Sequence, residues 1–189
     1  MARDARTQPL RVPLLLERLD ALNEARREHW LDLGRAQPAL IERLARGPNR
    51  LVVADFAAPD TERGLPGTVP AVPSTGFDVV LAWDWPNYLV PEGLSRLGAE
   101  LARCSHAGTV LHALIHYRND RMPETPQRLR LAADGRLDED GVVEHLRPAP
   151  RYSPKALEKA MCHWQVDRTL LLNNGMQEFV LRLRSTSAH

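Results

Sequence analysis

The sequence has few cysteines, few aromatic residues and no long apolar run. Its two cysteines, Cys104 and Cys162, form neither a CxxC pair nor the dense pattern of a secreted disulfide scaffold. The apolar run at residues 12–16 is too short for a signal peptide or a membrane span, and residues 1–9 are polar. These absences predict a reduced, cytoplasmic protein that does not enter a membrane.

A charge excess of either sign is also missing, because the sequence has 25 basic and 24 acidic residues. Proteins dedicated to nucleic acids or membrane surfaces concentrate positive charge, so the sequence carries no clear nucleic-acid signature. Only Lys155 and Lys159 among the basic residues are lysines. We attribute this bias to a GC-rich genome and expect a bacterial protein.

The length of 189 residues fits one domain, and 43% hydrophobic with 26% charged residues is ordinary globular usage. We therefore expect a single domain over residues 1–189, with residues 1–12 as a flexible N-terminal arm.

Apolar periodicity predicts helices that alternate with strands. The predicted helices span residues 14–27, 38–44, 91–103 and 154–162. The predicted strands span residues 29–33, 50–56, 77–83, 109–117, 164–172 and 176–183. Residues 57–76, which contain four prolines, and residues 118–151 are predicted as long loops.

Alternation of strands and helices implies right-handed crossovers and a parallel sheet. The Asn173-Asn174-Gly175 turn is tight enough to make the last two strands antiparallel. We expect an α/β fold: a Rossmann-like, mostly parallel sheet with helices on both faces, a C-terminal antiparallel β-hairpin and a shortened third-strand region. Strand 50–56 should lie near one edge, strands 29–33 and 77–83 in the centre, and the hairpin at the other edge.

The order of elements and motifs resembles the class I S-adenosylmethionine-dependent methyltransferases. The resemblance rests on Leu31-Asp32-Leu33-Gly34 between helices, on an acid at the end of the next strand, on Phe-Asp-Val-Val-Leu-Ala-Trp-Asp at 77–84, and on the C-terminal hairpin. It covers residues 14–184. It implies S-adenosylmethionine as the cofactor and methyl transfer to an acceptor that the sequence does not identify.

In that family a glycine-rich turn after the first strand passes against the methionine part of the cofactor. Gly34 matches the first glycine and Asp32 the leading acid, while Ala36 stands where a further glycine is usual. Asp55 matches the acid that binds the ribose hydroxyls, since a carboxylate can accept from both hydroxyls of a diol. The resemblance therefore implies cofactor binding by Asp32, Gly34, Ala36 and Asp55.

The strand at 77–83 matches the family's fourth strand, where cofactor and substrate meet. Open α/β sheets bind ligands outside the carboxyl ends of their strands, so position alone favours a site here. Trp83 is the cofactor-binding candidate at this strand end. The substrate-pocket candidates are Trp85, Asn87 and Tyr88.

Methyl transfer from a sulfonium needs mainly positioning and deprotonation of the acceptor. Asp84 and His116 are the candidate catalytic residues, although a histidine inside a strand is more often a hydrogen-bonded core residue. His112 and His116 share one strand face about 13 Å apart at the usual rise, which is too far for one ion. We expect no metal.

Two functions from different classes remain open. Asp32, Gly34 and Asp55 favour a methyltransferase, whereas Ala36 and Pro38, together with the absent third strand, favour a catalytically inactive methyltransferase-like binding or assembly module. A nicotinamide enzyme fits less well, because the turn lacks the later glycine of the dinucleotide motif.

The shortened third-strand region would leave strand 50–56 at an exposed sheet edge. Such edges are often covered by a partner, so we expect a homodimer. No other partner is predicted apart from the acceptor substrate.

Overall fold

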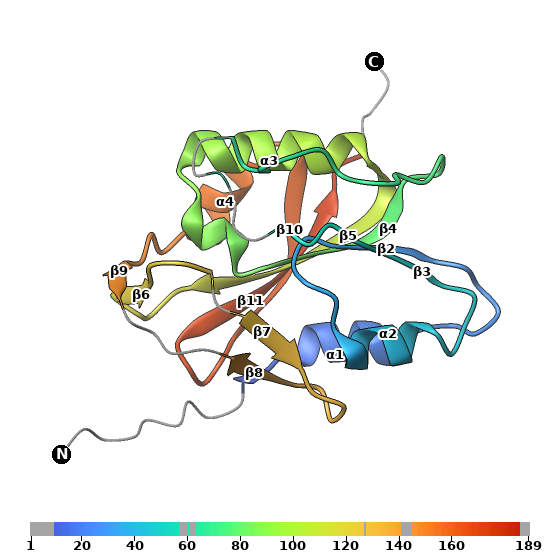
Figure 1. Ribbon diagram of the computed structural model, residues 1–189. Coiled ribbons are helices and arrows are strands. Elements are labelled where there is room, and N and C mark those ends of the chain that lie inside the picture. The colour runs from blue at the N-terminus through green and yellow to red at the C-terminus, as the bar shows by residue number, and fades with distance from the viewer. Residues whose placement is uncertain (1–9, 57–59, 61–62, 127, 141–144, 186–189) are drawn as a thin grey trace.

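A computed structural model describes residues 10–56, 60, 63–126, 128–140 and 145–185. Its main sheet has six strands in the order β10-β11-β5-β4-β2-β3 (Figure 1). These strands are β2 (His29–Asp32), β3 (Arg50–Val53), β4 (Phe77–Trp83), β5 (Ser105–His116), β10 (Trp164–Leu171) and β11 (Met176–Leu183). The helices are α1 (Pro13–Asp20), α2 (Pro38–Leu44), the short 3₁₀ helix η1 (Trp85–Tyr88), α3 (Pro91–Arg103) and α4 (Pro154–Ala160).

The sheet is mostly parallel, which confirms the predicted α/β class. Strands β3, β2, β4 and β5 pair in parallel, and β11 is antiparallel to both of its neighbours, β5 and β10. Strand β10 therefore runs in the same direction as β5, so only one strand of the sheet is reversed. As predicted, β3 lies at one edge, β2 and β4 in the centre, and β10 at the other edge.

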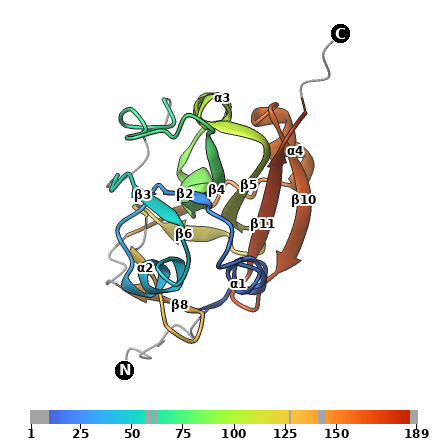
Figure 2. The same cartoon turned by 90° about the vertical axis from the view of Figure 1, so that its right-hand side faces the viewer.

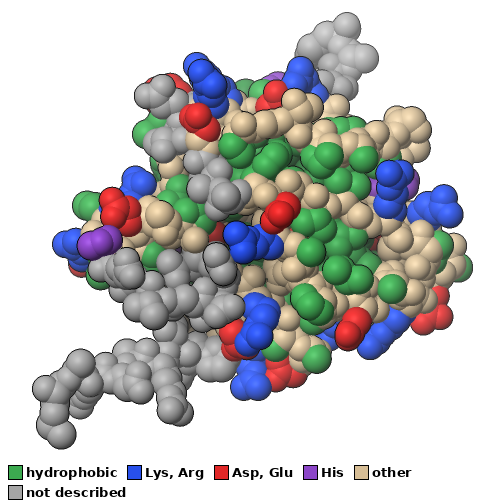
Figure 3. All heavy atoms as spheres, in the orientation of Figure 1, with side chains coloured by type: hydrophobic (Ala, Val, Ile, Leu, Met, Phe, Trp, Pro, Cys, Tyr) green, Lys and Arg blue, Asp and Glu red, His purple; other side chains and the backbone are tan. Residues whose placement is uncertain are grey.

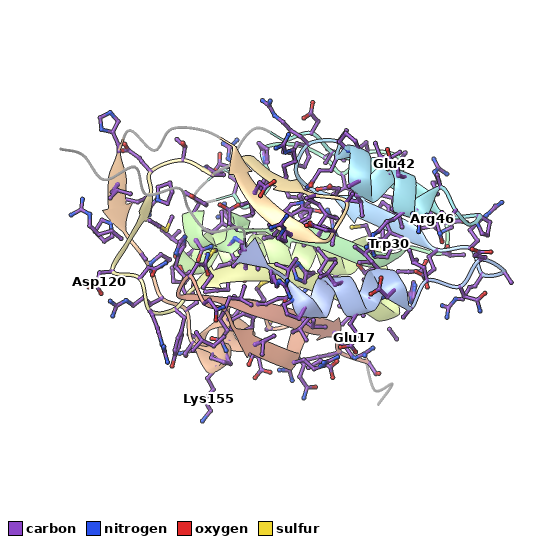
Figure 4. All side chains as sticks on the ribbon, turned by 90° about the horizontal axis from the view of Figure 1, so that it is seen from below. Glu17, Trp30, Glu42, Arg46, Asp120 and Lys155 are labelled. Atoms are coloured by element: carbon purple, nitrogen blue, oxygen red, sulfur yellow. The ribbon has the colours of Figure 1, made fainter. Side chains whose placement is uncertain are left out.

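Helices cover both faces of the sheet (Figure 2). On one face α3 buries Leu94, Leu97 and Leu101, which recur at helical spacing and pack into one core with α4. On the other face α1 and α2 flank Trp30, which is fully buried between them (Figure 4). In the described part of the chain, no helix has the length and apolarity needed to cross a membrane.

Helix α1 is shorter than the predicted 14–27, since it ends at Asp20. Beyond it, the side chain of Asn23 accepts a hydrogen bond from the backbone N–H of Ala25 at 2.8 Å. Such local bonds from asparagine compete with helix formation, which explains the early end.

The N-terminal arm predicted for residues 1–12 is packed at its C-terminal end. Leu10 and Val12 are buried, and β1 (Leu10–Arg11) pairs with a strand of the chain's middle segment. Residues 1–9 lie outside the described residues. The arm prediction is therefore wrong for residues 10–12, because their apolar side chains join the core beside α1.

The predicted loop at 118–151 contains four strands. They are β6 (Arg121–Pro123), β7 (Arg128–Leu131), β8 (Arg136–Asp140) and β9 (Leu146–Pro148). Strands β1, β8 and β7 form a small sheet below the main one (Figure 1), and β6 pairs with β9. The small sheet is held in place because Leu131 and Leu137 are buried in the α1–α2 core.

No regular helix or strand occurs among the described residues of segment 57–76, as predicted from its prolines. The chain instead packs closely on α3: a Cβ at Gly64 would lie 2.7 Å from the carbonyl oxygen of Gly93. Leu65 and Val69 are buried in the core of that face. Figure 3 shows that apolar side chains gather on the surface of the face that is turned to the viewer in Figure 1.

Candidate functional site

The predicted cofactor-binding residues meet at the carboxyl edge of β2, β3 and β4. Strand β2 ends at Asp32, and the following turn joins β3 through hydrogen bonds from Asp55 N to Gly34 O, at 3.1 Å, and from Phe56 N to Leu33 O, at 3.2 Å. This edge is where open α/β sheets bind ligands.

Asp32 is fully buried, and only one of its carboxylate oxygens is hydrogen-bonded. Oδ1 accepts from Gly34 N at 2.8 Å and from Trp83 Nε1 at 2.6 Å. Oδ2 has no hydrogen-bond partner among the described residues. Burial raises the pKa of Asp32 to about 7, against the two hydrogen bonds, which lower it. Oδ2 is therefore a buried acceptor that a ligand's donor or cation would satisfy.

Trp83 lies directly on this turn. It is the last residue of β4, it has a positive φ of +48°, and the pairing register with β5 shifts between Leu81 and Trp83. A Cβ built at Gly34 would meet Trp83 Cδ1 at 3.2 Å. The Trp83 and His112 rings are nearly perpendicular to each other, with 6.4 Å between their centroids. Trp83, itself a predicted cofactor-binding residue, therefore lies against Asp32 and Gly34. The sequence did not indicate its hydrogen bond to Asp32.

Ala36 and Asp55 form the exposed side of the site. The Asp55 side chain is 71% exposed, and its Oδ1 lies 4.0 Å from Arg35 Nε. The backbone of Asp55 has a positive φ of +50°. On the covered side, Gln37 is buried and its Oε1 accepts from Leu131 N at 2.7 Å. The turn is therefore open toward Asp55 and closed by β7 on the other side.

Asn87 was predicted to line a substrate pocket, and its side-chain amide forms hydrogen bonds with backbone groups. Its Nδ2 donates to the carbonyl oxygens of Asp84 and Leu114, at 2.7 and 2.8 Å. Its Oδ1 accepts from His116 N at 2.9 Å. Because the amide is fully buried and two of these three bonds reach β5, the Asn87 side chain ties η1 to that strand.

Trp85 and Tyr88, the other substrate-pocket candidates, are also buried. Trp85 packs in the α3 core, with its ring centroid 5.9 Å from that of Phe56. The Tyr88 hydroxyl donates to Thr125 O at 3.0 Å. These contacts hold the connection between β4 and α3 against the core.

The two catalytic candidates lie at the carboxyl ends of β4 and β5. Asp84 is buried and precedes η1. His116 is buried too, and its Nδ1 accepts from Asn119 Nδ2 at 3.2 Å. Burial lowers the pKa of His116 to about 4, so its imidazole is neutral near pH 7.

One further buried carboxyl group, that of Glu178, was not identified from the sequence. Glu178 on β11 is fully buried and accepts from Leu14 N at 3.0 Å and from Leu15 N at 2.8 Å. His112 Nε2 lies 2.7 Å from its Oε1. The signal in the sequence was a charged residue inside an apolar strand. In the β11–β5 register Glu178 pairs with Leu114, and His112 lies two residues before Leu114 on β5.

Metal binding finds no support in the side chains placed by the structure. Across residues 10–185, apart from the undescribed gaps, His, Cys, Asp and Glu form no group of three that could hold an ion.

Comparisons with known proteins give a structural likeness without a sequence match. No family model matches the chain, and no curated protein matches it. An S-adenosylmethionine-dependent methyltransferase from Clostridium acetobutylicum aligns with a TM-score of 0.52 and 11% identity, over 92% of this chain and 90% of that one. The mitomycin 7-O-methyltransferase MmcR aligns with a TM-score of 0.50 and 16% identity, over 88% of this chain and 52% of that one. The chain therefore has the fold of the class I S-adenosylmethionine-dependent methyltransferases.

Proposed function

We propose that the protein is an S-adenosylmethionine-dependent methyltransferase that acts on an unidentified acceptor. The observation that carries the proposal is the unpartnered Oδ2 of Asp32, at the carboxyl end of β2 and beside Gly34. Burying a carboxyl group without satisfying both oxygens costs free energy. Proteins retain such groups mainly at functional sites, which favours a ligand at this turn.

The chemistry of the turn fits the methionine end of this cofactor. That end carries an ammonium group, and Asp32 Oδ2 is a buried acceptor without a partner among the described residues. Gly34 allows close approach because it has no side chain. Asp55 is exposed at the neighbouring strand end, where its carboxylate can accept from two ribose hydroxyls.

The bound cofactor would supply an electrophilic methyl group on a sulfonium. The chain's own residues then hold the acceptor and take up its proton. We assign the proton to Asp84 or His116, the two candidate bases at the carboxyl ends of β4 and β5. Of these, His116 already accepts a hydrogen bond at Nδ1 from Asn119.

Titration with S-adenosylhomocysteine, the demethylated cofactor, tests the proposal. At a hundredfold excess over its dissociation constant, the ligand should stabilise the folded protein by about 2.7 kcal/mol. This corresponds to a rise in melting temperature of roughly 5 to 11 °C. Asp32→Asn, which keeps the shape of the side chain, should abolish the shift. A flat calorimetric titration with unchanged melting at millimolar ligand would contradict the proposal and leave the inactive-module hypothesis.

A further inference from the structure

We propose that Trp83 is a displaceable plug: without ligand its indole covers Gly34 at the cofactor turn, and cofactor binding moves it away. This inference rests on the proposed function, since it concerns the same site, and it adds a residue that controls access to it.

The first support is steric. The pyrrole edge of the indole lies against the side of Gly34 from which a side chain would project, with Cδ1 at 3.2 Å and Nε1 at 3.3 Å from the Cβ position. A ligand atom touching this face of the glycine would need the same space, since non-bonded atoms meet at about 3.5–4.0 Å. The indole and a ligand therefore cannot occupy this face of Gly34 together.

The second support is the pairing of polar groups within the turn. Trp83 Nε1 donates to Asp32 Oδ1 at 2.6 Å, and Gly34 N donates to the same oxygen. The carboxyl group is thus engaged on one side by the chain itself. Removal of the indole would free part of Oδ1 and open the side of the carboxylate that now faces the ring.

The third support is the backbone of Trp83. Four tryptophans are present, and all four are buried: Trp30, Trp83, Trp85 and Trp164. Of these, only Trp83 has a positive φ, at a point where the β4–β5 register is irregular. Bulky residues rarely adopt this conformation, and such strain gathers at ligand clamps and switch regions. Trp83 is therefore set apart from the tryptophans that serve only as core.

The test measures binding of S-adenosylhomocysteine by calorimetry and by tryptophan fluorescence. Trp83→Ala removes the plug and should bind the ligand about tenfold more tightly than the wild type, because no indole has to be displaced. Trp83→Phe keeps a ring but loses the N–H donor, so its affinity should lie between the two. Saturation should change the fluorescence of the wild type but not of Trp83→Phe. The matched control Trp85→Phe, a buried indole packed on Phe56, should retain the change.

The outcomes separate the plug from the proposed function. Equal affinity of the wild type and both Trp83 variants, or a fluorescence change that persists in Trp83→Phe, would overturn the plug and leave the proposed function intact. Binding by none of the three proteins would overturn the proposed function. Binding by Trp83→Ala alone would mean permanent closure and would overturn both. If Trp83→Ala does not fold, Trp83→Phe and the wild-type fluorescence still decide.

Discussion

Among the residues that the structure describes, two carboxyl side chains are fully buried toward the α1–α2 side of the sheet, Glu178 on β11 and Asp32 at the end of β2, and their surroundings differ. Both oxygens of Glu178 are bonded: Leu14 N and Leu15 N donate to them, and His112 contacts one. In Asp32, Oδ1 accepts two hydrogen bonds, whereas Oδ2 has no partner in the described structure.

The difference separates a structural role from a binding role. Glu178 satisfies the first backbone N–H groups of α1, which would otherwise lack acceptors, and so fixes that helix to β11 and β5. Asp32 is built into the fold with one buried oxygen, Oδ2, that no described protein group satisfies, which costs free energy. In our account the missing partner is the ligand, and each prediction below tests this contrast.

The largest expected effect is the loss of Glu178. Glu178→Ala leaves Leu14 N, Leu15 N and the His112 ring without their acceptor in a buried site, so we expect a loss of about 3–5 kcal/mol in the free energy of unfolding. Urea denaturation measures it. Glu17→Ala, which removes an exposed partner of Arg168 from the same helix, should leave the stability unchanged. A loss below about 1 kcal/mol in Glu178→Ala would end the structural interpretation.

Replacement of Asp32 should raise the free energy of unfolding, whereas replacement of Glu178 should lower it. The pKa of Asp32 is raised from 3.8 to about 7, so the folded protein holds this proton more tightly than the unfolded chain does. The contribution of Asp32 to stability therefore falls as the pH rises from about 4 to about 7 and stays level above that. His116, whose pKa is lowered to about 4, contributes a slope of the opposite sign, which cancels when the wild type is compared with Asp32→Asn. Asp32→Asn does not titrate and should be more stable than the wild type at pH 8, on the order of 3 kcal/mol, but not at pH 4. Denaturation at both pH values tests this, and a difference independent of pH would count against it.

A double-mutant cycle sharpens the picture of the turn. Gly34→Ala places a methyl group 3.2 Å from the Trp83 ring and should cost about 1–3 kcal/mol. In the Trp83→Ala background the ring is gone, so the cost should shrink, and the coupling energy should exceed about 0.5 kcal/mol. Additive losses measured by urea denaturation would show that the two residues do not press on each other.

The smallest effect is expected at the exposed end of the site. Asp55→Ala should weaken binding of S-adenosylhomocysteine by about tenfold through loss of the diol acceptor. It should hardly change stability, because the side chain is 71% exposed. Asp20→Ala, which alters a similarly exposed carboxylate near α2, serves as the calorimetric control. Equal binding by both variants would remove Asp55 from the site.

Much of the fold followed from local sequence signals. The bounds of β4, α3 and β11 match the predictions, because an unbroken apolar run, a first-turn proline and an Asn-Gly turn mark them. Strands β6 to β9 were missed, because they are three to five residues long and rich in charge, and so show little apolar alternation.

The sequence predicted which residues of the site lie at the carboxyl ends of the strands, and little more. Asp32 and Trp83 come together because parallel strands end at one edge. The direction of a side chain was not predictable: Asn87 turns to the backbone of β5, which depends on how η1 packs. Glu178 was missed because a charged residue in a strand usually faces water, whereas here the N-terminus of α1 covers it.

The most direct test of the central claim is the pH dependence of S-adenosylhomocysteine affinity. If Asp32 binds the ligand's ammonium group as a carboxylate, affinity should rise as Asp32 loses its proton around pH 7. Calorimetry at pH 6 and pH 8 should then give a dissociation constant about tenfold lower at pH 8 in the wild type. Arg35 and Asp55 also lie on this turn, so Asp55→Ala is measured alongside and should keep the pH dependence. The same affinity at both pH values, or no binding at either, would contradict the assignment of Asp32.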